Sequence, residues 1–152
     1  MTAATPKPNI LFLCTGNSSR SQMAEGWGRH FHDDKYNLYS AGIETHGLNP
    51  YAVKVMAEAG VDISHHRSKH LNEVLDALFD YVITVCSQAD ENCPVFPQKT
   101  IVVHRGFDDP AKYVKLGRPD DEIWIQFRRV RDEIGKFVKG LPEFLETINK
   151  EL

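Results

Sequence analysis

Residues 9–26, NILFLCTGNSSRSQMAEG, form the most informative stretch of this chain. The apolar run 10–13 is typical of a strand buried on both faces of a parallel sheet. Small polar residues follow it and lead into a helix, for which Ser19 and Gln22 match a capping box. Cys14 is therefore expected at the carboxyl end of a central strand, where the chain turns into a helix.

A strand, a polar loop and a helix in this order favour a site for an oxyanion. Backbone N–H groups of the loop converge on one place, and the positive end of the helix macrodipole adds to their field. Gly16 is free to take a positive φ here, and Arg20 offers a planar fork of donors for two oxygens. The same field favours the thiolate form of Cys14, which makes it a candidate nucleophile. The alternative, a cysteine that is only a small buried apolar residue, predicts no reactivity.

The composition indicates one ordinary globular domain over residues 1–152. The chain is 41% hydrophobic and 26% charged, and its net charge is −3. We therefore expect no general affinity for nucleic acid or for an anionic membrane. The N-terminal MTAATPKPN lacks an apolar core of signal-peptide length, and no apolar run is long enough to span a bilayer. Three cysteines, an odd number, fit working thiols in a reducing compartment, so we expect a cytoplasmic protein. We also expect a monomer.

Strand and helix patterns alternate along the rest of the chain. The expected strands are 10–13, 36–41, 81–86 and 100–103. The first expected helix begins near Ser19, and others cover 50–59, 71–78 and 123–137. The last of these is expected to break at 140–142 and to resume to about 148. Residues 104–119 read as a long loop. This order predicts an α/β domain of three layers, with a four-stranded parallel sheet flanked by helices.

Chemically useful residues converge on one edge of this sheet. Ligands of parallel sheets bind beyond the carboxyl ends of the strands, where Cys14, Cys86 and the loop after the fourth strand all fall. The separation of Cys86 from Cys93 fits no common zinc spacing. Histidines 65, 66 and 70 are expected in a surface loop. We therefore expect no metal site.

The motifs at this edge resemble a known family. Residues 14–21, CTGNSSRS, are similar to the phosphate-binding loop of low-molecular-weight protein tyrosine phosphatases, and Asp109-Pro110 is similar to their general-acid loop. The wider match is closer to the thioredoxin-coupled arsenate reductases built on that fold. It includes SQMAEGW, YSAGIETHGLNP, GFDDPA, FRRVRDEI and the pair Cys86 and Cys93, and it spans residues 9–136.

The resemblance implies a relay of three thiols. Cys14 attacks arsenate, and Cys86 then attacks the sulfur of Cys14, so that two electrons pass to arsenic and arsenite leaves. Cys93 next attacks the Cys14–Cys86 disulfide, and thioredoxin reduces the resulting Cys86–Cys93 disulfide. Asp109 is implied as the acid that protonates the departing oxygen. No bound cofactor is implied; thioredoxin is the external reductant.

The resemblance also implies a substrate-binding loop that would hold arsenate, with phosphate or sulfate as mimics. Ser21 is expected to donate a hydrogen bond to the Cys14 thiolate, and Asn17 to hold the shape of the loop. The binding residues implied are Thr15, Gly16, Asn17, Ser18, Ser19, Arg20 and Ser21.

Three departures from the family pattern carry expectations of their own. Ser19 stands where these families commonly have a second loop cysteine, so an in-loop disulfide with Cys14 is impossible, while the relay does not need that position. Ala111 follows Asp109-Pro110 where the phosphatases place an aromatic residue, which argues against a tyrosine phosphatase. Lys69 stands at the fourth position of a potassium site found in some of these reductases.

The other three positions of that potassium site match, as Asn17, Glu25 and Ser40. Because an ammonium group at position 69 would repel or replace a cation, we expect no potassium dependence.

Two other functions stay open from the sequence: a low-molecular-weight phosphatase acting on aryl phosphates or phosphotyrosine, and a non-catalytic sensor of oxyanion or thiol state. The relay also predicts a conformational change. If residues 87–92 are helical in the reduced protein, Cys86 and Cys93 lie roughly 10 Å apart along the axis. A disulfide needs Cα atoms about 4.4–6.8 Å apart, so oxidation must unwind that helix.

Overall fold

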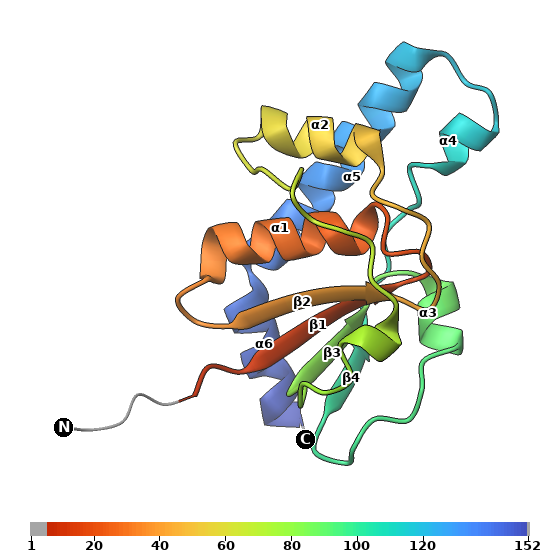
Figure 1. Cartoon of the computed structure of the whole chain (residues 1–152). Helices are drawn as coiled ribbons and strands as arrows, with labels where there is room; N and C mark the ends of the chain where they lie inside the picture. Colours follow the sequence, from red (N-terminus) through yellow and green to blue (C-terminus); the bar gives the residue numbers. More distant parts are fainter. Residues whose placement is uncertain (1–5, 152) are drawn as a thin grey trace.

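The computed structural model describes residues 6–151, so residues 1–5 of the expected N-terminal segment lie outside the described residues. Within this range, the strands form a four-stranded parallel sheet in the order β2-β1-β3-β4. The strands are β1 (Asn9–Cys14), β2 (Asn37–Gly42), β3 (Tyr81–Thr84) and β4 (Ile101–His104). Helices flank the sheet, and the predicted α/β class is confirmed (Figure 1).

The central position of β1 follows from its sequence. It pairs with β2 on one side and β3 on the other, and Ile10, Leu11, Phe12 and Leu13 are fully buried, as an apolar run without polar alternation requires. Cys14 pairs in register with Gly42, and Leu13 with Thr84. The carboxyl ends of the strands, with the loops that follow them, therefore lie at one edge of the sheet.

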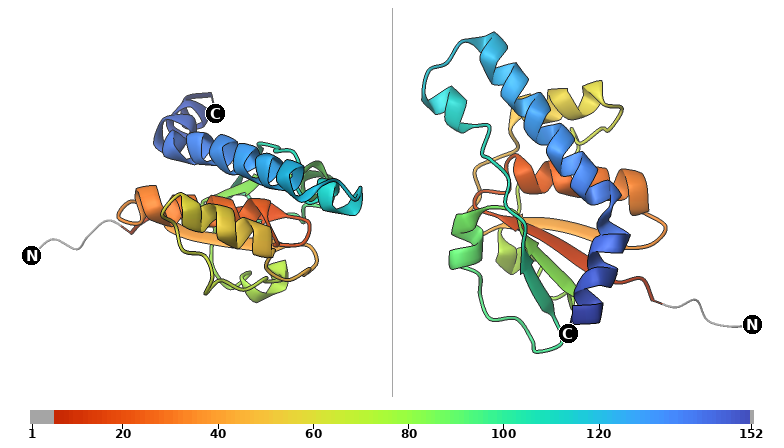
Figure 2. Two further views of the ribbon diagram at one scale, coloured as in Figure 1. Left: turned by 90° about the horizontal axis from the view of Figure 1, so that it is seen from above. Right: turned by 180° about the vertical axis from the view of Figure 1, so that it is seen from behind.

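The helices connect these strands and close the core. They are α1 (Arg20–His32), α2 (Pro50–Glu58), the 3₁₀ helix η1 (Leu71–Glu73), α3 (Ser87–Glu91), α4 (Lys112–Lys115), α5 (Asp120–Lys139) and α6 (Leu141–Glu151). α1 and α5 pack against each other, and Trp27 on α1 donates its indole N–H to Arg131 O at 3.1 Å. Figure 2 shows α5 running along α1 and continuing into α6.

The structure corrects several local predictions. α1 does begin after Ser19, but no capping box forms, because Gln22 turns inward and the Ser19 side chain makes no cap bond. The positive φ of the loop belongs to Asn17, at 48°, and not to Gly16. Gly16 is needed for another reason, since a Cβ there would lie 2.3 Å from Nδ1 of His46.

Other corrections concern element lengths. The helix predicted at 71–78 is reduced to the single turn η1, and the strand predicted at 81–86 ends at Thr84. The predicted loop 104–119 contains the short helix α4. Helix α2 follows its prediction closely, with Pro50 at its start and Gly60 at a φ of 84° just beyond its end.

Candidate active site

Cys14 ends β1 with its sulfur held by two donors of the loop that follows. The backbone N–H of Asn17 donates to Cys14 Sγ at 3.2 Å, and Ser21 Oγ is hydrogen-bonded to the same sulfur at 2.8 Å. Asn17 Nδ2 donates to Ser21 Oγ at 2.8 Å, which leaves the hydroxyl proton of Ser21 to point at the sulfur. Two hydrogen-bond donors therefore converge on the sulfur of Cys14, the candidate nucleophile.

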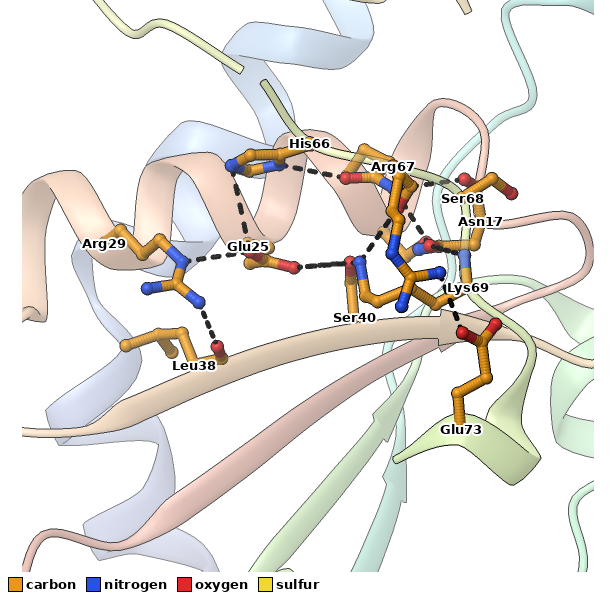
Figure 3. Close-up of polar contacts among 12 residues, drawn as sticks. Asn17, Glu25, Arg29, Leu38, Ser40, His66, Arg67, Ser68, Lys69 and Glu73 are labelled. Atoms are coloured by element: carbon orange, nitrogen blue, oxygen red, sulfur yellow. Dashed lines mark hydrogen bonds and ion pairs between the residues drawn. The ribbon is translucent and has the colours of Figure 1, made fainter. Parts of the chain in front are cut away.

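Asn17 is held by a chain of buried side chains behind the loop (Figure 3). Its Oδ1 accepts the backbone N–H of Lys69 at 2.8 Å and Nε2 of Gln22 at 2.9 Å. Gln22 Nε2 also donates to Arg67 O at 2.9 Å, so Gln22 Oε1 is the acceptor of a proton from His66 Nδ1 at 3.0 Å. These bonds fix Asn17 in its left-handed conformation and so set the shape of the loop.

The same network of side chains extends to Glu25, whose carboxylate is buried between polar groups of three segments. Ser40 donates to Glu25 Oε1 at 2.6 Å, and Arg29 donates to Oε2 at 2.9 Å. The ammonium of Lys69 lies 3.8 Å from Oε1 (Figure 3). Burial lowers the pKa of Lys69, while the charge of Glu25 acts in the opposite direction. Burial likewise lowers the pKa of His66, which favours its neutral form beside this cluster.

Cys86 lies at the start of α3, against the side chain of Thr15 in the phosphate-binding loop. Its sulfur is 3.2 Å from Thr15 Oγ1, on the residue next to Cys14, and it accepts the backbone N–H of Ala89 at 3.3 Å. Cys86 is thus the N-cap of α3, where the positive end of the short helix faces its sulfur. The structure brings Cys86 against the same loop that holds Cys14.

Cys93 follows α3 and is less buried than the other two cysteines. All three cysteines, at positions 14, 86 and 93, are free thiols, so the structure is that of the reduced chain. Burial, and next the carboxylate of Asp90, raise the pKa of Cys93 and keep it protonated. The segment 87–92, for which a helix was only a condition of the argument from sequence, forms α3 with Asn92 as its C-cap.

Arg20 and Asp109 meet across the mouth of the loop. Arg20 Nη1 donates to Phe107 O at 3.1 Å, and Nη2 lies 3.8 Å from Asp109 Oδ2. The other oxygen of Asp109 accepts the backbone N–H of Ala111 at 3.0 Å, which orients the carboxyl group. The guanidinium therefore stands between the phosphate loop and the loop that carries the expected acid.

A cavity of about 570 Å³ opens over Cys14. Of the predicted site residues, Thr15, Gly16, Ser18, Ser19, Arg20 and Asp109 also line it. Asn17 and Ser21 lie behind the loop and support it instead, and neither Cys86 nor Cys93 is part of the lining. The structure thus brings Cys14, Arg20, Asp109 and four of the predicted loop residues around one cavity, while Cys86 contacts Thr15 without lining it.

Sequence reasoning missed several residues around this cavity. Besides Ala111, already noted after Asp109-Pro110, its lining includes Glu44, His46, Asn49, Pro50, Tyr51, Gln88, Val114 and Lys115. Glu44 and His46 donate their backbone N–H groups to Thr15 O and Gly16 O at 2.8 and 3.0 Å, so the segment after β2 runs beside the phosphate loop. The parallel register of β1 and β2 was the signal for this proximity, because it places the residues after Gly42 beside those after Cys14.

Two of the three histidines considered as metal ligands, His66 and His70, have other contacts. His66 faces Gln22, and His70 caps η1 by accepting the backbone N–H of Asn72 at 3.0 Å. Across residues 6–151, no three His, Cys, Asp or Glu side chains gather where they could hold a metal ion. None of the helices in the described part of the chain is long and apolar enough to cross a membrane.

The chain is similar to known proteins in sequence and in fold. Residues 9–152 match the model of the family described as low molecular weight phosphotyrosine protein phosphatase. The chain is 54% identical over 128 residues to arsenate reductase 1 of Staphylococcus epidermidis, a match that covers 84% of this chain and 90% of that protein. A solved arsenate reductase in the oxidized state superposes with a TM-score of 0.73 at 30% identity, covering 88% of this chain and 95% of the other.

A third similar protein is a reductase whose reductant is known. It is a thioredoxin-dependent arsenate reductase of Corynebacterium glutamicum, with a TM-score of 0.65 and 25% identity, and the match covers 99% of this chain and 66% of that one. A family model that spans the domain and curated relatives at about half identity agree with the geometry around Cys14. The chain therefore belongs to the low molecular weight phosphotyrosine protein phosphatase family, on the branch occupied by arsenate reductases.

Proposed function

We propose that this protein reduces arsenate to arsenite and is recycled by thioredoxin. The observation that carries the proposal is the pairing of two thiols around one loop. Cys14 Sγ is held by Asn17 and Ser21. Cys86 Sγ contacts Thr15, the residue that follows Cys14. A phosphatase needs the first thiol only, whereas reduction of arsenic needs a second sulfur that can attack the first.

The first step forms a bond from sulfur to arsenic. The Cys14 thiolate attacks arsenate bound by the loop N–H groups and Arg20, and one arsenic–oxygen bond breaks. Asp109 protonates the departing oxygen, which leaves as water. Its position supports this role, since it lines the cavity over Cys14 and faces Arg20.

The second and third steps move electrons through the cysteines. Cys86 attacks the sulfur of Cys14, the sulfur–sulfur bond forms, and the electron pair of the broken sulfur–arsenic bond stays on arsenic, which leaves as arsenite. Cys93 then attacks Cys86, which releases Cys14 as a thiolate. Reduced thioredoxin then reduces the Cys86–Cys93 disulfide to two thiols and is itself oxidised to a disulfide. Such a relay requires a reducing compartment, so we infer that the protein works in the cytoplasm.

We further propose that the reaction does not depend on potassium. The support is the ammonium of Lys69 at 3.8 Å from Glu25, beside Ser40 and the loop residue Asn17. A fixed positive charge there supplies the field that a bound cation would supply in relatives with an oxygen-lined site.

The deciding experiment is arsenate-dependent oxidation of reduced thioredoxin, followed with arsenite release. We expect steady turnover by the native chain, none by Cys14→Ser, and none by Cys86→Ser. Cys93→Ser should release about one arsenite per chain and stop, because only the recycling step needs Cys93. Steady release of phosphate from an aryl phosphate, without arsenate-dependent thioredoxin oxidation, would favour a phosphatase and contradict the proposal.

A further inference from the structure

Two consecutive carboxylates of the loop after β4 point to opposite sides. Asp109 lines the cavity over Cys14 and faces Arg20, while Asp108 does not line it. Asp108 Oδ2 instead accepts a hydrogen bond from Arg129 Nη2 on α5 at 2.6 Å, and Oδ1 is paired with Lys112 at the start of α4. Two neighbouring residues of the same type therefore have different surroundings, with one facing substrate and the other facing a helix.

Arg129 is itself held in place from two sides. Its Nε donates to Gln126 at 2.8 Å, and its Nη1 donates to the carboxylate of Glu133 at 3.1 Å, both within α5. The guanidinium is thus fixed by its own helix before it reaches the loop. Lys112 belongs to the same short segment as Asp108 and cannot anchor that segment to the body of the protein. The pair of Asp108 with Arg129 ties that segment to α5. It adds to the contacts of Phe107, whose N–H donates to Val85 O at 3.0 Å and whose carbonyl accepts from Arg20.

The charges support a persistent contact. Although burial of Asp108 acts to raise its pKa, hydrogen bonds from Lys112 and Arg129 outweigh burial and hold that pKa below its usual range. The neighbouring Asp108 and Glu133 carboxylates raise the pKa of Arg129 despite its partial burial. Both shifts favour the charged forms of the pair, the carboxylate of Asp108 and the guanidinium of Arg129.

The importance of such a contact lies in position rather than in stability. Partly exposed ion pairs add little to the stability of a fold. A general acid, however, contributes about 10²–10⁴-fold to a rate, and a displacement of about 1 Å at the reacting group can remove about 10²-fold. Asp109 directly follows the anchored residue, so any movement of Asp108 moves Asp109 relative to Arg20 and Cys14.

We propose that Arg129, through Asp108, is a positioning residue that holds the general acid Asp109 over the substrate. This inference rests on the proposed function for the identity of the reaction, but its geometry does not. α5 thereby acts on the chemistry from outside the cavity, with no contact to the oxyanion, to Cys14 or to the two recycling thiols.

A double-mutant cycle on the single-turnover release of arsenite tests this inference. Arg129→Met should lower the rate about tenfold in the native background, and Arg129→Lys should recover part of it by keeping one donor. Asp109→Asn alone should lower it by about a hundredfold. In the Asp109→Asn background, Arg129→Met should then change the rate by less than about twofold, because the group it positions is gone.

The matched control is Arg128→Met, one residue away. Arg128 binds Glu58 with two hydrogen bonds of 2.9 Å and makes no contact with the acid loop, so its loss should leave the rate unchanged. Equal losses from Arg129→Met in the native and Asp109→Asn backgrounds would show a purely structural role and overturn the inference. So would an unchanged rate for Arg129→Met in the native background.

A measurement that needs no activity separates this inference from the proposed function. Amide hydrogen exchange over residues 106–112 should be faster in Arg129→Met than in the native protein and in Arg128→Met. Equal exchange in all three would overturn the inference. A native chain that releases no arsenite would defeat the proposed function, and the exchange experiment would still decide whether Arg129 anchors the loop.

Discussion

At the scale of single residues, Ser19 is unusual because it occupies the N-cap of α1 without using its hydroxyl. Its Oγ is buried and has no hydrogen-bond partner among residues 6–151. A serine N-cap ordinarily contributes about 1 kcal/mol through its side-chain bond, and that bond is missing here. An unsatisfied buried hydroxyl instead carries a desolvation penalty of about 1–3 kcal/mol.

We therefore predict that Ser19→Ala leaves the protein equally stable or raises its melting temperature by up to about 3 °C, as measured by thermal unfolding. Ser21→Ala is the matched control. It removes the partner of both Cys14 Sγ and Asn17 Nδ2, so it should lower the melting temperature. A fall of more than about 3 °C for Ser19→Ala would contradict this reading of the cap.

The same loop shows why residue detail was only partly predictable. Gly16 and Asn17 both tolerate a positive φ, so the sequence could not distinguish them. The structure assigns Gly16 to the close approach of His46 and Asn17 to the left-handed position. Gln22 matched a capping box locally, but its partners include Arg67 O, which lies 45 positions away along the chain. Contacts of that range are invisible to a local motif.

At the scale of elements, α3 was not predicted from the sequence; the three-thiol relay only indicated what a helix at 87–92 would have to do on oxidation. The shortening of 71–78 to η1 was not predicted either, because the apolar residues of that segment suggested a buried helix face. Leu75 and Leu78 are in fact 46% and 77% exposed, and Leu71 is the buried leucine of that segment. Without a buried face, a short segment gains too little from packing to extend as a helix.

We predict that oxidation to the Cys86–Cys93 disulfide unwinds α3. Ala89 is a small anchor, and Pro94 prevents extension of the helix, so the loss of helix is inexpensive. Hydrogen exchange on both redox forms, with the disulfide verified by mass, should show faster exchange over 87–93 in the oxidised form. Equal protection in the two forms would refute the change of shape.

The carboxylate of Asp90 gives α3 a second measurable property. Burial and Asp90 raise the pKa of Cys93, so the rate of its attack on the Cys14–Cys86 disulfide should rise as pH rises toward that pKa. Asp90→Asn removes the second of these causes, which lowers the pKa and should speed exchange at neutral pH by about two- to threefold. Stopped-flow measurement of the exchange step, with Glu91→Gln as the control, checks this. An unchanged pH profile would exclude Asp90 as a cause.

The loop between α2 and η1 supplies Lys69 to the Glu25 cluster seen in Figure 3. We predict that Lys69→Asp makes the reductase rate rise with added potassium, because a carboxylate would complete an oxygen-lined site with Glu25, Ser40 and Asn17. The rate is compared in potassium and sodium buffers of equal ionic strength, with Lys69→Met as the control for loss of the ammonium. Equal rates of Lys69→Asp in both buffers would reject the site.

At the scale of the whole molecule, the fold class followed from the alternation of apolar runs, but the packing of distant helices did not. Gly135 on α5 lies beneath the ring of Trp27 on α1, and an added Cβ would come within 2.9 Å of that ring. The ring cannot easily move away, because its N–H is bonded to Arg131 O. A glycine inside a helix pattern shows in the sequence, but the ring above it comes from a helix more than a hundred residues earlier.

Gly135→Ala should therefore destabilise the protein by about 1–3 kcal/mol by overpacking, although alanine is the better helix former by about 1 kcal/mol. Gly140→Ala is the control, since a Cβ there would meet its nearest atom at an ordinary 3.7 Å. Chemical denaturation should show a loss for the first variant and little change for the second. A more stable Gly135→Ala protein would mean that α1 and α5 can separate at little cost.

In the proposed relay, the sulfur that caps α3 is also a reacting group. Cys86 Sγ accepts the N–H of Ala89 in the reduced chain, and it can do so well only as a thiol or thiolate. Once that sulfur is bonded to Cys14, the helix loses an N-cap contribution of about 1 kcal/mol, or roughly a fivefold change in its equilibrium. α3 is thus most stable before arsenite leaves and weakest immediately afterwards. In the proposed relay, the resting enzyme therefore resists premature closure of the Cys86–Cys93 bond, and formation of the Cys14–Cys86 bond weakens α3 for the next step.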